Sequence, residues 1–188
     1  MNETYKLFLD LDGCIVNFNK GYKKLTNNIS IEKIRDKQGD KVARDTFLNA
    51  GSKFWEDLEW IDGGKELYNA ASSLFKHVYI LSSAGTTDEA KAKIVEKGKC
   101  DWIIKNIPSM KMENVIIARG RHQKQKYASP LSILVDDLSD TIKLWDENGG
   151  IGILHKSDNY HLTITKLKEL SVSSGKIKLK ELISTGIC

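Results

Sequence analysis

Five short runs of apolar residues are spaced along the chain: YKLFLDLD, HVYILSS, NVIIARG, LSILVDD and IGILH. Each is rich in Val, Ile, Leu or aromatic residues, which is typical of strands buried on both faces of a parallel sheet. Helix-like segments separate them. One begins with capping residues and is expected to stop at Gly98 (TTDEAKAKIVEKG), and another ends in two glycines (SDTIKLWDENGG). This alternation predicts a doubly wound, Rossmann-like α/β domain with a parallel sheet.

A long polar, helix-like segment follows the first run. About seventy residues separate Asp12 from Ser82, whereas a parallel crossover needs only about a dozen. We expect residues 17–61 to form a small helical cap inserted after the first strand, with extra helices packed on the sheet as the alternative. The α/β core then comprises residues 1–16 and 62–165. Residues 166–188 hold amphipathic pieces joined by SVSSG and are expected to form a C-terminal helical extension or a tail.

Composition adds few constraints. The chain has 188 residues, enough for one sizeable domain, and its net charge of +4 is too mild to indicate an anionic ligand by itself. Three scattered cysteines fit a reducing compartment, so a cytoplasmic location is expected. The N-terminus has no signal-like segment, and no apolar stretch approaches the roughly 20 residues of a membrane span, so no membrane association is expected.

Polar residues stand at the ends of three apolar runs: Asp10 and Asp12, Ser82 and Ser83, and Asp136 and Asp137. The carboxyl ends of parallel strands share one edge of a sheet, where ligands bind. Carboxylates gathered there repel one another unless a cation or protons offset their charge. Mg²⁺ suits an all-oxygen site that also holds a phosphate. With a serine hydroxyl and a nearby lysine, Lys126 or Lys124, the chain carries the groups that phosphoryl transfer needs.

In this order, DLDG, ILSS, a downstream lysine and ILVDD resemble the four motifs of haloacid dehalogenase (HAD) superfamily phosphatases, over roughly Lys6 to His155. The resemblance implies an HAD-like fold in which Asp10 is the nucleophile and Asp12 is the general acid and base. It makes Ser82 the hydroxyl of the second motif. Lys126 is our choice for the motif lysine. Because IIARGRHQKQKY is a few residues longer than the family's version, Lys124 and Arg121 compete for that role.

The same resemblance implies a Mg²⁺ cofactor. Its ligands would be Asp10, Asp136 and the backbone carbonyl of Asp12, with Asp137 supporting the metal shell.

A closer resemblance is to the 5'(3')-deoxyribonucleotidases of that superfamily. In those enzymes an aromatic residue that packs on the base follows the acidic box, as Phe18 does here, and an FW element closes the cap, like Phe54-Trp55. A Lys-x-x-Trp helix also follows the second motif, like KCDWII, although LSSAG lacks the expected proline. The resemblance implies that Phe18 and Trp55 bind substrate, and Ser83 and Lys124 are further candidates for substrate binding. The alternative for the aromatic residues is packing inside the cap.

We therefore expect a Mg²⁺-dependent phosphomonoesterase that hydrolyses (deoxy)nucleoside monophosphates through an aspartyl-phosphate. The alternatives are another small phosphoester, such as a sugar phosphate, or a polynucleotide or protein phosphate. A response-regulator receiver domain is rejected because the lysine here precedes the acidic pair, and a silent binding module is disfavoured by the presence of both Asp10 and Asp12. The expected partner is a small phosphorylated substrate, with no membrane and no stable nucleic-acid partner, and a homodimer is left open.

Overall fold

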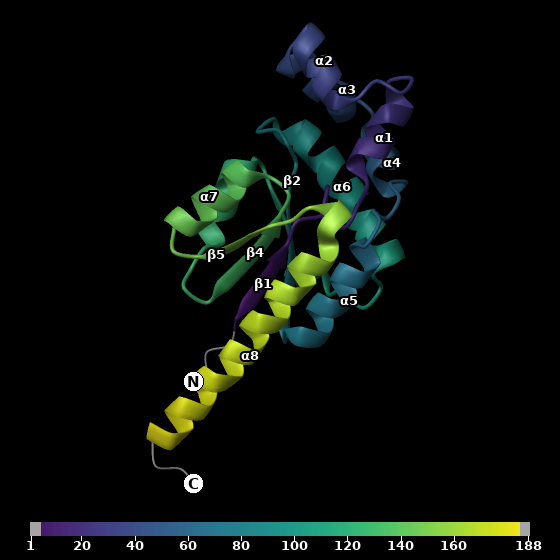
Figure 1. Ribbon diagram of the computed structural model, residues 1–188. Helices are drawn as coiled ribbons and strands as arrows, with labels where there is room; N and C mark the ends of the chain where they lie inside the picture. Colours follow the sequence, from purple (N-terminus) through teal and green to yellow (C-terminus); the bar gives the residue numbers. More distant parts are fainter. Residues whose placement is uncertain (1–4, 185–188) are drawn as a thin grey trace.

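The computed structural model describes residues 5–184, with side chains described as far as residue 172. Within them, five parallel strands form one sheet in the order β3-β2-β1-β4-β5 (Figure 1). The strands are β1 (Lys6–Leu9), β2 (His77–Ser83), β3 (Val115–Ala118), β4 (Ser132–Asp136) and β5 (Ile151–Leu154). The five apolar runs of the sequence are thus confirmed as the strands of a doubly wound α/β fold.

Helices fill the connections between the strands. Between β1 and β2 lie α1 (Phe18–Leu25), α2 (Ile31–Gln38), α3 (Asp40–Leu48), α4 (Gly51–Glu56) and α5 (Gly64–Leu74). After β2 come α6 (Glu89–Asn106) and the 3₁₀ helices η1 (Met112–Asn114) and η2 (Arg121–Tyr127), on either side of β3. The chain then continues through α7 (Ser139–Glu147), η3 (Ser157–Asn159) and α8 (Tyr160–Ser184).

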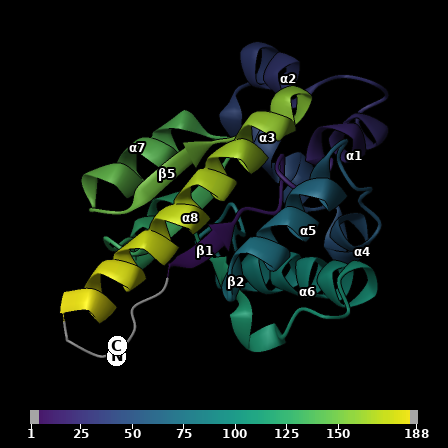
Figure 2. The same cartoon turned by 60° about the horizontal axis from the view of Figure 1, so that its bottom comes forward.

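Successive residues of β1 face opposite sides of the sheet, as the two-residue period of a strand requires. Leu7 and Leu9 belong to the larger apolar core, with residues of α5, α6 and α8. Phe8 belongs to the smaller core on the other face, with residues of α7. The helices α5 and α8 lie side by side over the first face (Figures 1 and 2). Burial on both faces explains why the strands read as continuous apolar runs.

Gly98 does not end its helix, contrary to our expectation, because α6 continues to Asn106. A Cβ at position 98 would lie 2.2 Å from the backbone oxygen of Ser52, which belongs to α4. Glycine therefore allows α4 and α6 to cross closely, and this packing stabilises a helix that local propensity would stop. The joint expected at SVSSG is also wrong, because α8 runs through it as one helix. Residues 185–188 lie outside the described residues.

The segment inserted after β1 carries a small core of its own. Tyr22, Ile31, Ile34 and Ala43 pack together, and the Tyr22 hydroxyl donates to the backbone oxygen of Ala43 at 3.1 Å. Figure 1 shows α2 and α3 beyond the end of the sheet, on the side where the strands finish. The inserted helices are thus placed over the strand ends, as a cap would be. The domain boundaries at residues 17 and 61 stay a prediction.

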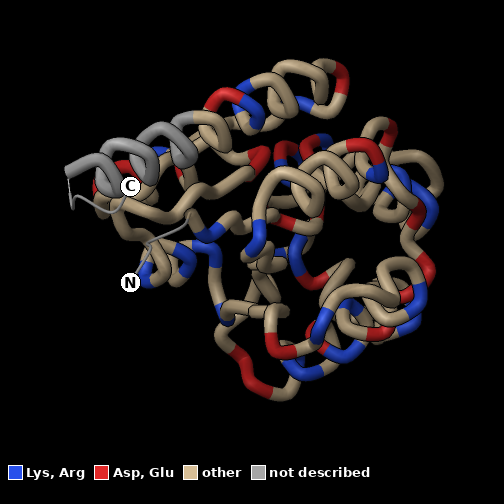
Figure 3. Tube along the Cα trace, turned by 90° about the horizontal axis from the view of Figure 1, so that it is seen from below, with Lys and Arg blue, Asp and Glu red and all other residues tan. Residues whose placement is uncertain are grey.

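Lys and Arg positions are interspersed with Asp and Glu positions along the described part of the chain (Figure 3). Among the described residues, no helix is both long and apolar enough to cross a membrane.

Candidate active site

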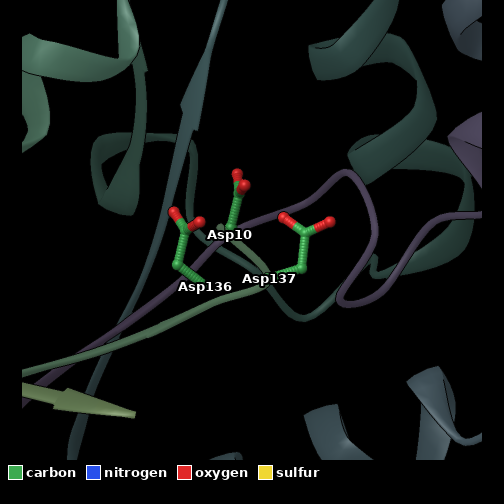
Figure 4. A group of neighbouring side chains, drawn as sticks. All are labelled: Asp10, Asp136 and Asp137. Carbon is green, nitrogen blue, oxygen red and sulfur yellow. The ribbon is translucent and has the colours of Figure 1, made fainter. Parts of the chain in front are cut away.

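Three carboxylates meet where β1 and β4 end. Asp10 follows β1 and Asp136 ends β4, and these strands pair in parallel with Leu9 opposite Val135, so the two acids are neighbours. Asp137 follows directly. Each of the three offers a carboxylate oxygen within 4.8 Å of the others (Figure 4). The residues Asp10 and Asp136 are only 6% and 0% exposed, so their charges are poorly screened by water.

Lys124 joins two of these acids. Its ammonium nitrogen lies 3.0 Å from Asp10 Oδ1 and 2.7 Å from Asp136 Oδ2, and the residue is 2% exposed. Burial opposes the charge of this ammonium, but Asp10 and Asp136 outweigh burial and raise the pKa of Lys124.

Lys126, our choice from the sequence, is exposed instead. Both lysines belong to the 3₁₀ helix η2, in which three residues make one turn, so residues two apart point in different directions. The structure therefore places Lys124, and not Lys126, against the carboxylates.

A second lysine, Lys99 of α6, holds Asp12. Its ammonium nitrogen lies 2.6 Å from Asp12 Oδ2, 2.9 Å from Ser82 Oγ and 2.7 Å from the backbone oxygen of Ser83. Lys99 is the first residue of KCDWII, and the motifs in the sequence assign it no role. A signal was present, however. Val95 and Trp102 are buried one turn before and one turn after Lys99, so the lysine stands on the apolar face of its helix.

The carboxylate of Asp12 therefore points to Lys99 and is not one of the three clustered acids. Burial raises the pKa of Asp12, and the Lys99 ammonium partly offsets this. The other oxygen, Oδ1, is shielded from solvent and accepts no hydrogen bond from the described residues. A buried acceptor without a donor costs about 1–3 kcal/mol, so a donor that enters the site stabilises this arrangement. The backbone carbonyl of Asp12 stays a proposed metal ligand.

The donor set fits a divalent cation. Among the residues that the structure describes, the carboxylates of Asp10, Asp12, Asp136 and Asp137 face two buried ammonium groups, those of Lys99 and Lys124, so acidic groups outnumber these basic groups by two. This crowding affects Asp137, where burial and repulsion from the neighbouring carboxylates raise the pKa to about 7. All-oxygen ligands with excess negative charge are what Mg²⁺ binds in proteins. The acidic cluster is thus consistent with a Mg²⁺ site.

Gly13 brings the acidic box against Asp137. Its φ of +77° is a left-handed conformation that side chains other than glycine rarely adopt, and its N–H donates to the backbone oxygen of Val16 at 2.9 Å. A Cβ at this position would lie 2.2 Å from Asp137 Oδ2. Glycine is therefore required both by the turn and by the space that Asp137 occupies.

The site opens into a cavity of about 790 Å³ between the strand ends and the inserted helices. Asp10, Asp12 and Ser82 line it from the sheet, and Phe18 and Phe47 line it from the helices. Ser83 also lies there, with its hydroxyl oxygen accepting from the N–H of Gly85 at 3.0 Å. The predicted site residues other than Lys126 are therefore brought to one place.

Trp55 is packed among the aromatic residues of the inserted helices. Its ring is stacked on Phe18 with centroids 5.6 Å apart, the Lys99 ammonium nitrogen lies 4.8 Å from the ring centroid, and Phe47 and Phe54 meet it edge-on. Only 2% of Trp55 is exposed. This burial favours packing inside the cap, the alternative, although Trp55 still borders the cavity, so its substrate-binding role stays a prediction. Phe18 is half-buried and faces the cavity.

Comparison with known proteins yields distant structural likenesses. No protein-family model matches the chain, and no curated protein matches it. An HAD hydrolase of family IA, variant 3, from Entamoeba histolytica is 10% identical with a TM-score of 0.49, covering 89% of this chain and 99% of its own. An HAD family enzyme from Bacteroides thetaiotaomicron, in complex with magnesium and inorganic phosphate, is 18% identical with a TM-score of 0.46, covering 85% and 99%.

A phosphonoacetaldehyde hydrolase-like protein from Oleispira antarctica is 13% identical with a TM-score of 0.47, covering 92% of this chain and 86% of its own. Likeness at this level does not assign the chain to a family. The fold and the site define it as a doubly wound α/β protein whose strand ends hold a buried centre of acids and lysines.

Proposed function

We propose that the chain is a Mg²⁺-dependent phosphomonoesterase of the HAD type that acts through an aspartyl-phosphate on Asp10. The proposal rests mainly on one observation. The buried ammonium of Lys124 forms ion pairs with both Asp10 and Asp136, and Asp137 lies beside these two acids. A structural ion pair needs one acid for each base. Here the acids outnumber the bases, at a strand edge that opens into a cavity, which is the arrangement expected of a site that binds a cation and an anion together.

Asp10 is the proposed nucleophile. One of its carboxylate oxygens attacks phosphorus, a new O–P bond forms, and the bond from phosphorus to the ester oxygen breaks. Asp12 lies two residues further along and donates its proton to the departing oxygen. Asp12 then removes a proton from a water that attacks the aspartyl-phosphate, which releases inorganic phosphate and restores Asp10. Two carboxylates with different surroundings are thus given two roles.

Lys124 and Ser82 are proposed to hold the phosphoryl group. An ammonium has three N–H donors, and Lys124 uses two of them on Asp10 and Asp136, so one remains for a phosphoryl oxygen. The hydroxyl of Ser82 accepts from Lys99, so its own hydrogen is free to donate. Mg²⁺, held by Asp10, Asp136 and the Asp12 carbonyl with support from Asp137, would supply positive charge to the phosphoryl oxygens.

The proposed substrate is a (deoxy)nucleoside monophosphate. A cavity of about 790 Å³ lies within the usual range for small-molecule sites, roughly 300–1,000 Å³, and leaves room for a nucleoside beyond the phosphate. Phe18 and Phe47 offer aromatic surface on the cap side, and Trp55, which is 2% exposed, borders the cavity with little of its surface. Aromatic surface opposite a phosphate site favours a planar base over a sugar alone. A sugar phosphate is the competing substrate.

A phosphate-release screen tests the proposal. The panel comprises 5' and 3' mononucleotides, sugar phosphates, a phosphopeptide and a 5'-phosphorylated oligonucleotide, each with Mg²⁺ and with excess chelator. We expect release from a mononucleotide only with Mg²⁺, and a loss of several orders of magnitude in Asp10→Asn, because a neutral amide cannot attack phosphorus. Release only from sugar phosphates would overturn the substrate, and full activity of Asp10→Asn would overturn the mechanism.

A further inference from the structure

Lys99 is placed to hold a reacting group and not to bind substrate. Its ammonium has three N–H donors, and the three acceptors around it are Asp12 Oδ2, Ser82 Oγ and the Ser83 backbone oxygen, at 2.6–2.9 Å. All three donors are therefore used. Lys124, in contrast, pairs with two acceptors among the described residues, Asp10 and Asp136, and has one donor to spare, so the two buried lysines of the site are not equivalent.

The protein around Lys99 fixes the ammonium in one place. The residue is 1% exposed, and the absence of a side chain at Gly98 lets α4 approach α6 beside it. One turn further along α6, the indole N–H of Trp102 donates to the backbone oxygen of Leu58 at 2.7 Å. Ser82 and Ser83 end β2, which pairs with strands on both sides, so the ammonium has two rigid acceptors besides Asp12.

We propose that Lys99 is a positioning residue for Asp12: it binds one carboxylate oxygen of Asp12 and holds that side chain at the angle required to pass its proton to the departing oxygen. The inference rests on the proposed phosphomonoesterase function. Asp12 follows β1, whereas Lys99 belongs to α6, so the contact links two elements that are far apart in the sequence. A general acid that is about 1 Å out of place can lose a hundredfold in rate.

The test is a mutant cycle with two kinds of substrate. Asp12→Asn, Lys99→Met and the double variant are compared on p-nitrophenyl phosphate, whose leaving group departs without a proton, and on the best alkyl phosphate of the screen, whose leaving group needs one. The measured quantity is kcat/KM, which reports the steps through cleavage of the ester bond. Lys97→Met is the matched control, because Lys97 lies on the same helix and pairs with Asp101 on the surface.

We expect Lys99→Met to lose roughly 10–100-fold on the alkyl ester and only about threefold on the nitrophenyl ester. In the Asp12→Asn background the same substitution should cost no more than about threefold, since a residue that acts through Asp12 has nothing left to position. Lys97→Met should match the wild type. A melting curve for each variant checks folding, and Lys99→Gln, which keeps N–H donors, replaces Lys99→Met if that variant is unfolded at the assay temperature.

Equal losses on the two esters, or a full further loss in the double variant, would overturn the positioning role, because a phosphate ligand or a merely structural residue gives that pattern. If the wild type releases no phosphate from any ester, the proposed function fails and this role fails with it. An active wild type with additive losses rejects the Lys99 inference alone.

Discussion

Replacing Lys124 with Met should destabilise the metal-free protein far more than replacing Lys126. Lys124 is 2% exposed and pairs with Asp10 at 3.0 Å and with Asp136 at 2.7 Å. Removing one partner of a buried ion pair costs about 3–5 kcal/mol, because the remaining charge stays buried without compensation. Here two carboxylates lose their partner, so we expect a loss near the upper end of that range at pH 8. Lys126 is exposed, and its substitution should change the free energy of unfolding by less than about 0.5 kcal/mol.

The loss should depend on pH in a defined direction. Burial and Asp10 already raise the pKa of Asp136, and removal of Lys124 raises it further. A group whose pKa is raised by folding favours the folded state at low pH and disfavours it as the pH rises through its folded pKa. The cost of Lys124→Met should therefore shrink as the pH falls from 8 to 5, because the raised pKa lets Asp136 take up a proton and lose its unpaired charge.

Urea unfolding of both variants in excess chelator, followed by tryptophan fluorescence at the two pH values, measures these differences. The reasoning is refuted if Lys124→Met and Lys126→Met lose equal stability, or if the loss for Lys124→Met grows toward pH 5.

The remaining predictions concern four residues of the site and the cap. Because folding raises the pKa of Asp137 from 3.8 to about 7, the metal-free protein should lose stability as the pH rises from 4 to 7, and Asp137→Asn or saturating Mg²⁺ should flatten that slope in urea unfolding. Gly13→Ala should weaken Mg²⁺ binding about tenfold or more by isothermal titration calorimetry, since its Cβ would meet Asp137 Oδ2 at 2.2 Å; unchanged affinity would exclude this contact. Phe18→Ala should raise KM for a nucleotide more than for p-nitrophenyl phosphate, whereas Trp55→Ala should lose about 3–5 kcal/mol of stability and impair both substrates alike.

The sheet and the acidic centre could be predicted because their signals are local. Continuous apolar runs identify strands buried on both faces, and the acids follow directly in the chain, as Asp10 follows Leu9 and Asp136 follows Val135. Parallel strands then place their carboxyl ends on one edge without any further information. The pairing of Leu9 with Val135 fulfils this, so the two acids meet as expected.

Which lysine meets those acids could not be predicted in the same way. Lys124 and Lys126 lie two positions apart in a polar segment. The direction in which each side chain points depends on whether this segment forms an α-helix, with 3.6 residues per turn, or a 3₁₀ helix, with three. The choice is made by packing of η2 against α7, a contact that the local sequence does not contain. The prediction that the helix ends at Gly98 was wrong for a similar reason. Close packing against the backbone of α4, and not the local sequence of α6, decides whether the helix continues there.

The burial of Lys99 could be predicted from the pattern of its helix, but its partner could not. A lysine on the apolar face of a helix must meet acceptors in the interior, because an unpaired buried ammonium is too costly to keep. That inference needs only the spacing to Val95 and Trp102. The identity of the acceptor, Asp12, depends instead on how α6 lies across the ends of β1 and β2. The Lys99 ammonium also lies over the ring of Trp55, which packs with Phe18, Phe47 and Phe54 in one aromatic cluster. Lys99 therefore contacts both this cluster and Asp12, the proposed general acid. Substitutions in that cluster are therefore expected to lower the rate of phosphate release by displacing Lys99 and with it Asp12, even where the substituted residues do not contact the substrate.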